Sequence, residues 1–158
     1  MTEGRRTGST SETHRAGVEF AQLLEPGDVV LLCGQLGAGK TTFTQGVAFG
    51  LGVADRVTSP TFIMVREHLC VDHPSIRVLH HADLYRTNSL DEIIDLALGE
   101  LVEESAVAVI EWGDMAEEIF AASAIWLRLS ALGEFEREFS VSGYPEARRA
   151  AFEAWSSS

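Results

Sequence analysis

Gly34-Gln35-Leu36-Gly37-Ala38-Gly39-Lys40-Thr41 matches the full phosphate-loop pattern G-x-x-x-x-G-K-[ST], which in α/β proteins joins a strand to a helix. Lys40 is the only lysine among the 12 lysine and arginine residues of the chain, and it occupies the one position that requires lysine. Lysine is a compact ammonium on a flexible stem, whereas arginine is a planar fork, so lysine lies more readily between two phosphate groups. The pattern predicts a loop that binds the phosphates of a nucleoside triphosphate.

The segments on either side of this loop supply the context that a phosphate loop needs. Residues 28–33 are a short apolar run that ends at Gly34, as expected for a buried parallel strand. Beyond the loop, Phe43, Val47 and Leu51 recur at helical spacing. A strand, a glycine-rich loop and a helix in this order indicate an α/β protein of the P-loop NTPase type.

The residues predicted to bind nucleotide follow from the loop itself. Glycines let backbone N–H groups approach the phosphates, and the start of the next helix favours their negative charge. Lys40 would contact the β- and γ-phosphates, and Thr41 would offer its hydroxyl to Mg²⁺, so a nucleoside triphosphate and Mg²⁺ are the expected cofactors. The predicted set within the loop is Leu36, Gly37, Ala38, Gly39, Lys40, Thr41 and Thr42.

Length and composition bound the class of protein. In 158 residues we expect a flexible arm over 1–10, a single P-loop ATPase domain over 11–155 and a tail over 156–158. No apolar run approaches the roughly 20 residues of a membrane span, and two cysteines suit a reducing compartment, so a cytoplasmic protein is expected. The formal net charge of −12 opposes direct binding of DNA or RNA, so any nucleic-acid role should be indirect, through a partner.

Other periodic segments predict a mixed sheet with a parallel core, an antiparallel edge hairpin and flanking helices. An apolar stripe over residues 11–24 predicts a helix ahead of the first strand. Phe135, Phe139 and Val141 alternate with polar residues, which is typical of a hairpin strand with one buried face. The expected strands, besides 28–33, cover residues 62–69, 76–84, 106–110, 125–130 and 135–141.

Hydrolysis of a bound nucleotide needs acids near the loop, and two expected strands end in one. Asp83 ends the strand that contains His80 and His81, and Glu111 follows the run 106–110. Ligands of open α/β sheets lie at the carboxyl ends of the strands, so either acid could hold Mg²⁺ or orient the attacking water. The hydroxyls of Ser59 and Thr61, on a loop after the predicted phosphate-loop helix, are predicted to form a switch that senses the γ-phosphate.

Four motifs, taken in order, resemble those of the TsaE (YjeE) family, a family of ATPases in bacterial tRNA threonylcarbamoyladenosine biosynthesis. They are residues 34–43, Ser59-Pro60-Thr61-Phe62, His81-Ala82-Asp83-Leu84-Tyr85-Arg86 and Glu111-Trp112. The resemblance runs from about Thr13 to Glu111. It departs from the family pattern at Gln35, where aspartate is usual, and at His68, where tyrosine is common.

The resemblance implies a small P-loop ATPase that is weakly active alone. It would act with TsaB and TsaD, which transfer the threonylcarbamoyl group to adenosine 37 of tRNAs that read codons beginning with A. By the same resemblance, Thr41 and Glu111 should hold Mg²⁺, and Thr42 should lie near the phosphates. Asp83 should assist hydrolysis, and Thr13 should approach the adenine.

Three other functions share the phosphate loop. A small-molecule kinase needs an acceptor site and an arginine-bearing lid, and the arginines of this chain are scattered. A GTPase would need an N-K-x-D motif, and the only lysine of the chain already belongs to the phosphate loop. A nucleotide-dependent scaffold without productive hydrolysis is hard to distinguish from an ATPase by sequence. The scaffold and the kinase therefore both remain as alternative functions.

Overall fold

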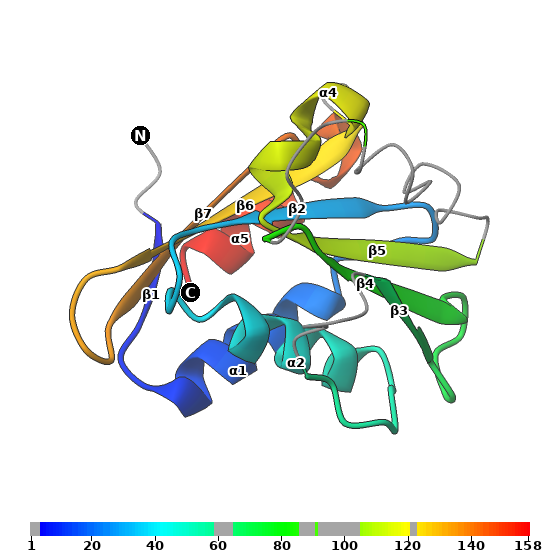
Figure 1. Ribbon diagram of the computed structural model, residues 1–158, viewed down its shortest axis with the longest axis horizontal. Coiled ribbons are helices and arrows are strands. Elements are labelled where there is room, and N and C mark those ends of the chain that lie inside the picture. Colours follow the sequence, from blue (N-terminus) through cyan, green and yellow to red (C-terminus); the bar gives the residue numbers. More distant parts are fainter. Residues whose placement is uncertain (1–3, 59–64, 86–90, 92–104, 121–122) are drawn as a thin grey trace.

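The computed structural model describes residues 4–58, 65–85, 91, 105–120 and 123–158. Within them, seven strands form one sheet in the order β1-β7-β6-β2-β5-β4-β3 (Figure 1). The strands are β1 (Arg5–Thr7), β2 (Val29–Cys33), β3 (Val65–Leu69), β4 (Val78–Asp83), β5 (Ala106–Glu111), β6 (Ala124–Ala131) and β7 (Arg137–Ser142). The helices are α1 (Thr10–Ala21), α2 (Lys40–Gly50), α4 (Glu117–Phe120) and α5 (Arg149–Ser156), with 3-10 turns η2 (Gly113–Ala116) and η3 (Glu146–Arg148).

The centre of the sheet is parallel and its two sides are antiparallel. β2 lies between β5 and β6, parallel to both, and β4 continues the parallel part beyond β5. β3 pairs antiparallel with β4 at one edge, and β7 pairs antiparallel with β6 on the other side. The predicted mixed sheet with a parallel core is confirmed. The predicted hairpin is present as β6 and β7, but it does not form the edge, because β1 pairs beyond β7.

Residues 5–7 are strand β1 and not part of a flexible arm, so the prediction for residues 1–10 was wrong in this segment. The Arg5 guanidinium is buried, pairs with the Glu19 carboxylate at 2.6 Å and lies 5.2 Å from the centre of the Trp155 ring. Thr7 is buried as well, and its hydroxyl oxygen lies 2.8 Å from that of Thr13. The sequence did not predict β1 because a three-residue polar strand shows no apolar alternation, and because its partner strand β7 lies far away in the sequence.

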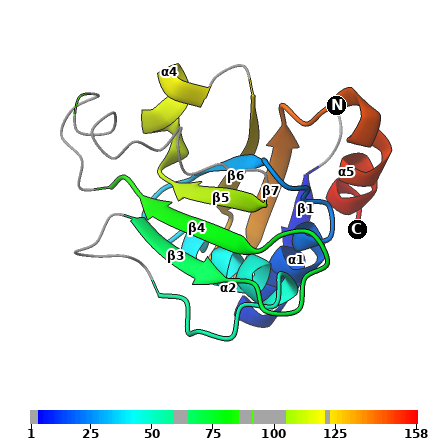
Figure 2. The ribbon, with the colours of Figure 1, turned by 90° about the vertical axis from the view of Figure 1, so that its right-hand side faces the viewer.

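Each face of the sheet carries its own apolar layer. Figures 1 and 2 show α1 and α2 together on one face, with η2 and α4 on the other. Along β2, Val30 and Leu32 join the cluster with α1 and α2, whereas Val29 and Leu31 join the cluster with α4. Successive side chains of a strand point to opposite faces, so a strand covered on both sides is apolar throughout.

Helices α1 and α2 cross at a very short distance because glycines lie at the contact. A Cβ added to Gly46 would overlap the backbone carbonyl of His14, and one added to Gly17 would lie 2.9 Å from the amide nitrogen of Val47. Only glycine permits this approach of two backbones. The crossing holds the N-terminal end of α2 beside the first helix.

The C-terminal helix α5 was not expected from the sequence. Phe152 and Trp155 are buried in the cluster of α1 and α2, and the Trp155 indole N–H donates to the Ala16 carbonyl at 3.0 Å. Ser156 is part of this helix and buried, so the predicted tail over 156–158 was wrong at its first residue. Among the described residues, no helix has the length and apolar content needed to cross a membrane.

Candidate functional site

The phosphate loop joins β2 to α2, and its backbone depends on glycine at two positions. Gly37 has φ +80° and Gly39 has φ +97°, in the left-handed region that glycine enters without a Cβ penalty. Gly39 is the N-cap of α2, so no side chain caps the first turn of the helix, and that turn contains no acidic residue. The free N–H groups and the positive end of the helix dipole therefore face outward, which favours a bound anion.

Lys40 lies against the loop and not in open solvent. Its ammonium donates to the carbonyl oxygens of Gly34 at 2.6 Å and Gln35 at 2.9 Å, and it lies 4.1 Å from the centre of the Trp112 ring. Burial lowers the pKa of Lys40, and the carboxylates of Glu111, Asp83 and Asp114 oppose this shift. A cation with its hydrogen bonds met by loop carbonyls is ready to exchange them for phosphate oxygens.

Trp112 adopts a backbone conformation that is rare for its residue type. Its φ is +59°, the one positive φ among the described residues other than glycine. The ring lies over the Lys40 ammonium on one side, and the Tyr85 ring centre is 4.9 Å away. Strained backbone of this kind concentrates at functional sites, where the surrounding contacts hold it.

Thr41 and Glu111 lie together at the end of β5. The Thr41 hydroxyl donates to one carboxylate oxygen of Glu111 at 3.1 Å, and His81 Nε2 lies 2.5 Å from the other. Glu111 and His81 are both buried. Asp83 is directly opposite Glu111 in the β4–β5 register, so both acids predicted from strand ends lie at the same edge of the sheet.

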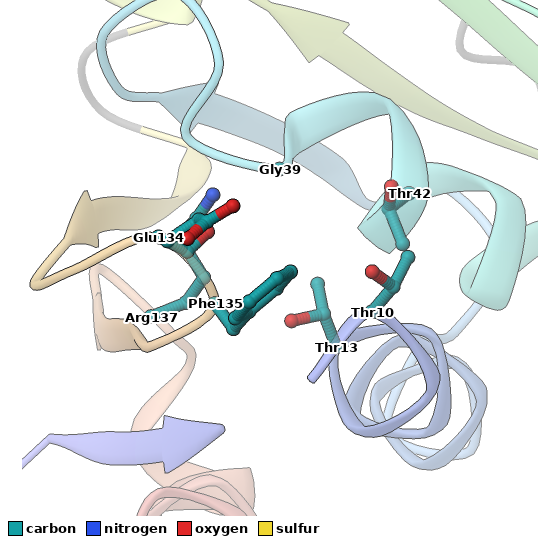
Figure 3. Close-up of a pocket in the computed structure, with 7 residues that line it drawn as sticks. All are labelled: Thr10, Thr13, Gly39, Thr42, Glu134, Phe135 and Arg137. Atoms are coloured by element: carbon teal, nitrogen blue, oxygen red, sulfur yellow. The ribbon is translucent and has the colours of Figure 1, made fainter. Parts of the chain in front are cut away.

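A small cavity of about 50 Å³ lies beside the N-terminal end of α2 (Figure 3). Thr10 and Thr13 of α1, Gly39 and Thr42 line one side (Figure 3). On the other side lie Glu134 and Phe135 of the β6–β7 turn and Arg137, the first residue of β7 (Figure 3). The ring of Phe135 extends from that turn toward the threonines (Figure 3). The cavity is much smaller than the roughly 300–1,000 Å³ of a ligand pocket, so it offers hydroxyls and one aromatic ring to one part of a nucleoside and does not enclose it.

Arg137 ties the β6–β7 turn to the phosphate loop. Its guanidinium donates to the carbonyls of Gly133 and Glu136, each at 2.9 Å, and to that of Glu134 at 3.2 Å. A further bond of 3.2 Å reaches the carbonyl of Gly37 in the phosphate loop. One side chain therefore sets the shape of the turn and its distance from the loop.

Comparisons with known proteins identify the family to which this chain belongs. The family model described as threonylcarbamoyl adenosine biosynthesis protein TsaE matches residues 7–139. The chain belongs to the TsaE family. Curated TsaE proteins are similar to it over most of their length: that of Treponema pallidum is 39% identical, with 84% of this chain and 95% of the relative covered. That of Streptomyces coelicolor is 42% identical, with 82% and 89% covered. The crystal structure of Bacillus subtilis YdiB is similar at a TM-score of 0.73 and 32% identity, covering 96% of this chain and 91% of that one.

In this TsaE family member the structure gathers most of the residues predicted for the site. Gly37, Ala38, Gly39, Lys40 and Thr41 form the loop and the start of α2, and Thr13 and Thr42 line the neighbouring cavity. Leu36 is 75% exposed at the tip of the loop. The predicted switch residues Ser59 and Thr61 lie outside the described residues.

Five residues of the site were missed by the sequence reasoning: Thr10, which lines the cavity, and His81, Glu134, Phe135 and Arg137. Phe135 was expected to alternate into the sheet, but it lies in the turn beyond the last β6–β7 pair, Ala131 with Arg137, and is 60% exposed. Arg137 and Glu134 carried no motif. His81 was left without a role, because alternation along a strand shows only that one of His80 and His81 faces the loop.

Proposed function

We propose that this TsaE family member is an ATPase that depends on Mg²⁺. We further propose that it acts with TsaB and TsaD in the threonylcarbamoyl modification of adenosine 37 of tRNA. The observation that carries the proposal is the contact of Thr41 with Glu111 beside an uncapped helix N-terminus and the Lys40 ammonium. This combination supplies hydrogen-bond donors for phosphates and oxygen ligands for a cation within one small region.

The phosphates would bind where the N–H groups of the loop and of the first turn of α2 point outward. Lys40 would leave the carbonyls of Gly34 and Gln35 and contact the β- and γ-phosphate oxygens, which neutralises charge that develops during transfer. The nucleoside would lie over the mouth of the cavity at Thr13 and Thr42, with its base against the Phe135 ring. Stacking on an aromatic ring uses the π-face that every base has, so Phe135 would support binding without reading the identity of the base.

Thr41 and Glu111 are the residues that would hold Mg²⁺. A hydroxyl and a carboxylate are hard oxygen donors of the kind this ion prefers, and they lie 3.1 Å apart here. Among the described residues no group of three or more histidine, cysteine or acidic side chains could hold a metal, so we expect the ion to arrive with the nucleotide. Bound Mg²⁺ would neutralise negative charge on the phosphates.

Asp83 is the residue that we propose to orient the attacking water. It lies opposite Glu111 in the β4–β5 register, and one of its carboxylate oxygens accepts from the Tyr85 amide at 2.9 Å. Water would add to the γ-phosphorus while the bond to the β,γ-bridging oxygen breaks, with ADP as the leaving group. The charge of −12 supports an arrangement in which the partner proteins, and not this chain, hold the tRNA.

The test is Mg²⁺-dependent ATP hydrolysis by the chain alone and with purified TsaB and TsaD. We expect slow turnover alone that rises with both partners, and loss of tight ATP binding in Lys40→Ala. Glu111→Gln should bind ATP in the ternary mixture but stall hydrolysis. ATP-dependent assembly with full biological function in Glu111→Gln would replace the ATPase proposal with a nucleotide-dependent scaffold. Unchanged ATP affinity in Lys40→Ala would overturn the assignment of the phosphate loop.

A further inference from the structure

Two buried histidines lie on one face of neighbouring strands, outside the phosphate loop. His68 of β3 is 2% exposed and His81 of β4 is fully buried. His68 is paired with Leu79, two residues before His81, so both imidazoles point to the face that carries α1 and α2. Diagonal neighbours of this kind have backbones roughly 7–8 Å apart, within reach of long and ring-bearing side chains.

The bond to Glu111 determines what His81 needs at its other nitrogen. An ionised carboxylate can only accept, so Nε2 of His81 carries the hydrogen that it directs at Glu111. In the neutral ring, Nδ1 is then an acceptor that requires a donor. No donor to this nitrogen is found among the residues that the structure describes.

Among the described residues, the two ring nitrogens of His68 are unsatisfied as well. Neither has a hydrogen-bond partner within the described part of the chain, and the Asp55 carboxylate is 3.9 Å from Nδ1, beyond hydrogen-bonding distance. Burial lowers the pKa of His68, which favours a neutral ring that both donates and accepts. Unsatisfied buried polar atoms are rare in native proteins, and a buried water typically makes about three hydrogen bonds.

We propose that His68 and His81 share one buried water, and that His68 is thereby a positioning residue of the nucleotide site. The water donates to Nδ1 of His81 and binds the His68 ring, which holds His81 in the tautomer with hydrogen on Nε2. His81 in turn holds Glu111 with its other carboxylate oxygen directed at Thr41. The effect of His68 on Mg²⁺ rests on the proposed function of Glu111, whereas its effect on the His81 tautomer does not.

His68→Phe is the direct test, because it keeps a ring of similar size and removes both nitrogens. In protein labelled with ¹⁵N-histidine, the wild type should show His81 as one tautomer, with Nδ1 accepting a hydrogen bond. His68→Phe should show mixed His81 tautomers, and His68→Gln, which keeps a donor and an acceptor, should restore the wild-type signals at least in part. A single wild-type His81 tautomer in His68→Phe would overturn the proposal.

The second readout is the Mg²⁺ concentration that half-saturates the metal-dependent part of nucleotide binding. Outer groups around metal ligands typically change metal affinity by 10-fold or more, so we expect an increase of about 10-fold in His68→Phe. Nucleotide affinity measured in EDTA should stay unchanged, which a general loss of structure would not allow. Unchanged Mg²⁺ dependence beside mixed His81 tautomers would overturn the link to Glu111.

If neither the wild type nor the variants bind ATP, the proposed function fails, and the NMR spectra still decide the shared water. If His68→Phe does not fold, the wild-type spectra alone test the shared water. Absence of a hydrogen bond to Nδ1 of His81 in the folded wild type would then overturn it.

Discussion

Replacing Phe135 with alanine should weaken nucleotide binding without weakening the fold. The side chain is 60% exposed in the β6–β7 turn and faces the cavity beside Thr13 and Thr42. A phenylalanine side chain has roughly 200 Å² of surface, so roughly 120 Å² of Phe135 is open to a ligand. A base that covers about half of this area would gain about 1.5 kcal/mol at ~25 cal/mol per Å². The dissociation constant of ADP should therefore increase about 10-fold in Phe135→Ala.

Calorimetric titration with ADP and with tripolyphosphate separates the base from the phosphates. Tripolyphosphate has no base, so its affinity should be the same in Phe135→Ala and the wild type. Phe49→Ala is the matched control, because Phe49 is 69% exposed and lies on α2, about 15 Å along the helix from the phosphate loop. Both variants should stay within about 0.5 kcal/mol of the wild-type free energy of unfolding, since neither ring is deeply buried.

Two results would refute this reasoning about Phe135. Equal ADP affinity in Phe135→Ala and Phe49→Ala would show that the base does not lie against the ring. An equal loss of ADP and tripolyphosphate affinity would show that Phe135 acts on the shape of the phosphate loop, through the turn that Arg137 joins to Gly37.

Three further predictions concern stability and reactivity. Gly46→Ala should lower the free energy of unfolding by roughly 1–3 kcal/mol in urea titrations, because the added methyl meets the backbone carbonyl of His14; an unchanged midpoint would contradict the close helix crossing. Burial raises the pKa of Cys70 to about 11 and also raises that of Cys33, so iodoacetamide at pH 7.5 should label neither thiol until the chain unfolds, as mass spectrometry would detect. Burial lowers the pKa of His68 in the folded chain, so the unfolded chain binds the proton more tightly. The contribution of the neutral His68 ring to the free energy of unfolding is therefore complete above about pH 6.5 and declines as the pH falls below that value. The free energy of unfolding of His68→Phe should decline less between pH 7 and 5 than that of the wild type, and parallel declines would refute this origin.

Much of the site could be predicted because its signals are local in the sequence. The phosphate loop is eight consecutive residues, and its two glycines with left-handed backbone and its single lysine follow from the geometry that a loop around phosphates requires. Asp83 and Glu111 were found by a rule of the same kind, since each ends an apolar run and parallel strands end at one edge of a sheet. Their register, with the two acids opposite each other, agrees with that rule.

The elements that were missed depend on partners far away in the chain. β1 is polar and three residues long, and it is held by β7 and by the contacts of Arg5 with Glu19 and Trp155. Phe135 fits the alternation of a strand, yet the turn between β6 and β7 still includes Phe135, and strand pairing starts only at Arg137. A side-chain period reports which face a residue would occupy, but not where pairing stops.

Local sequence patterns were enough to predict a phosphate loop between a buried strand and a helix, and two acids after neighbouring strands. Those features need only the conformations of adjacent residues and the alternation of side chains along a strand. Tertiary structure alone decided that Phe135 and Arg137 face the loop and that His81 holds Glu111. It also decided that His68 lies next to His81. Each of these contacts joins separate strands or turns, and packing across the sheet, which no local pattern contains, selects the partner.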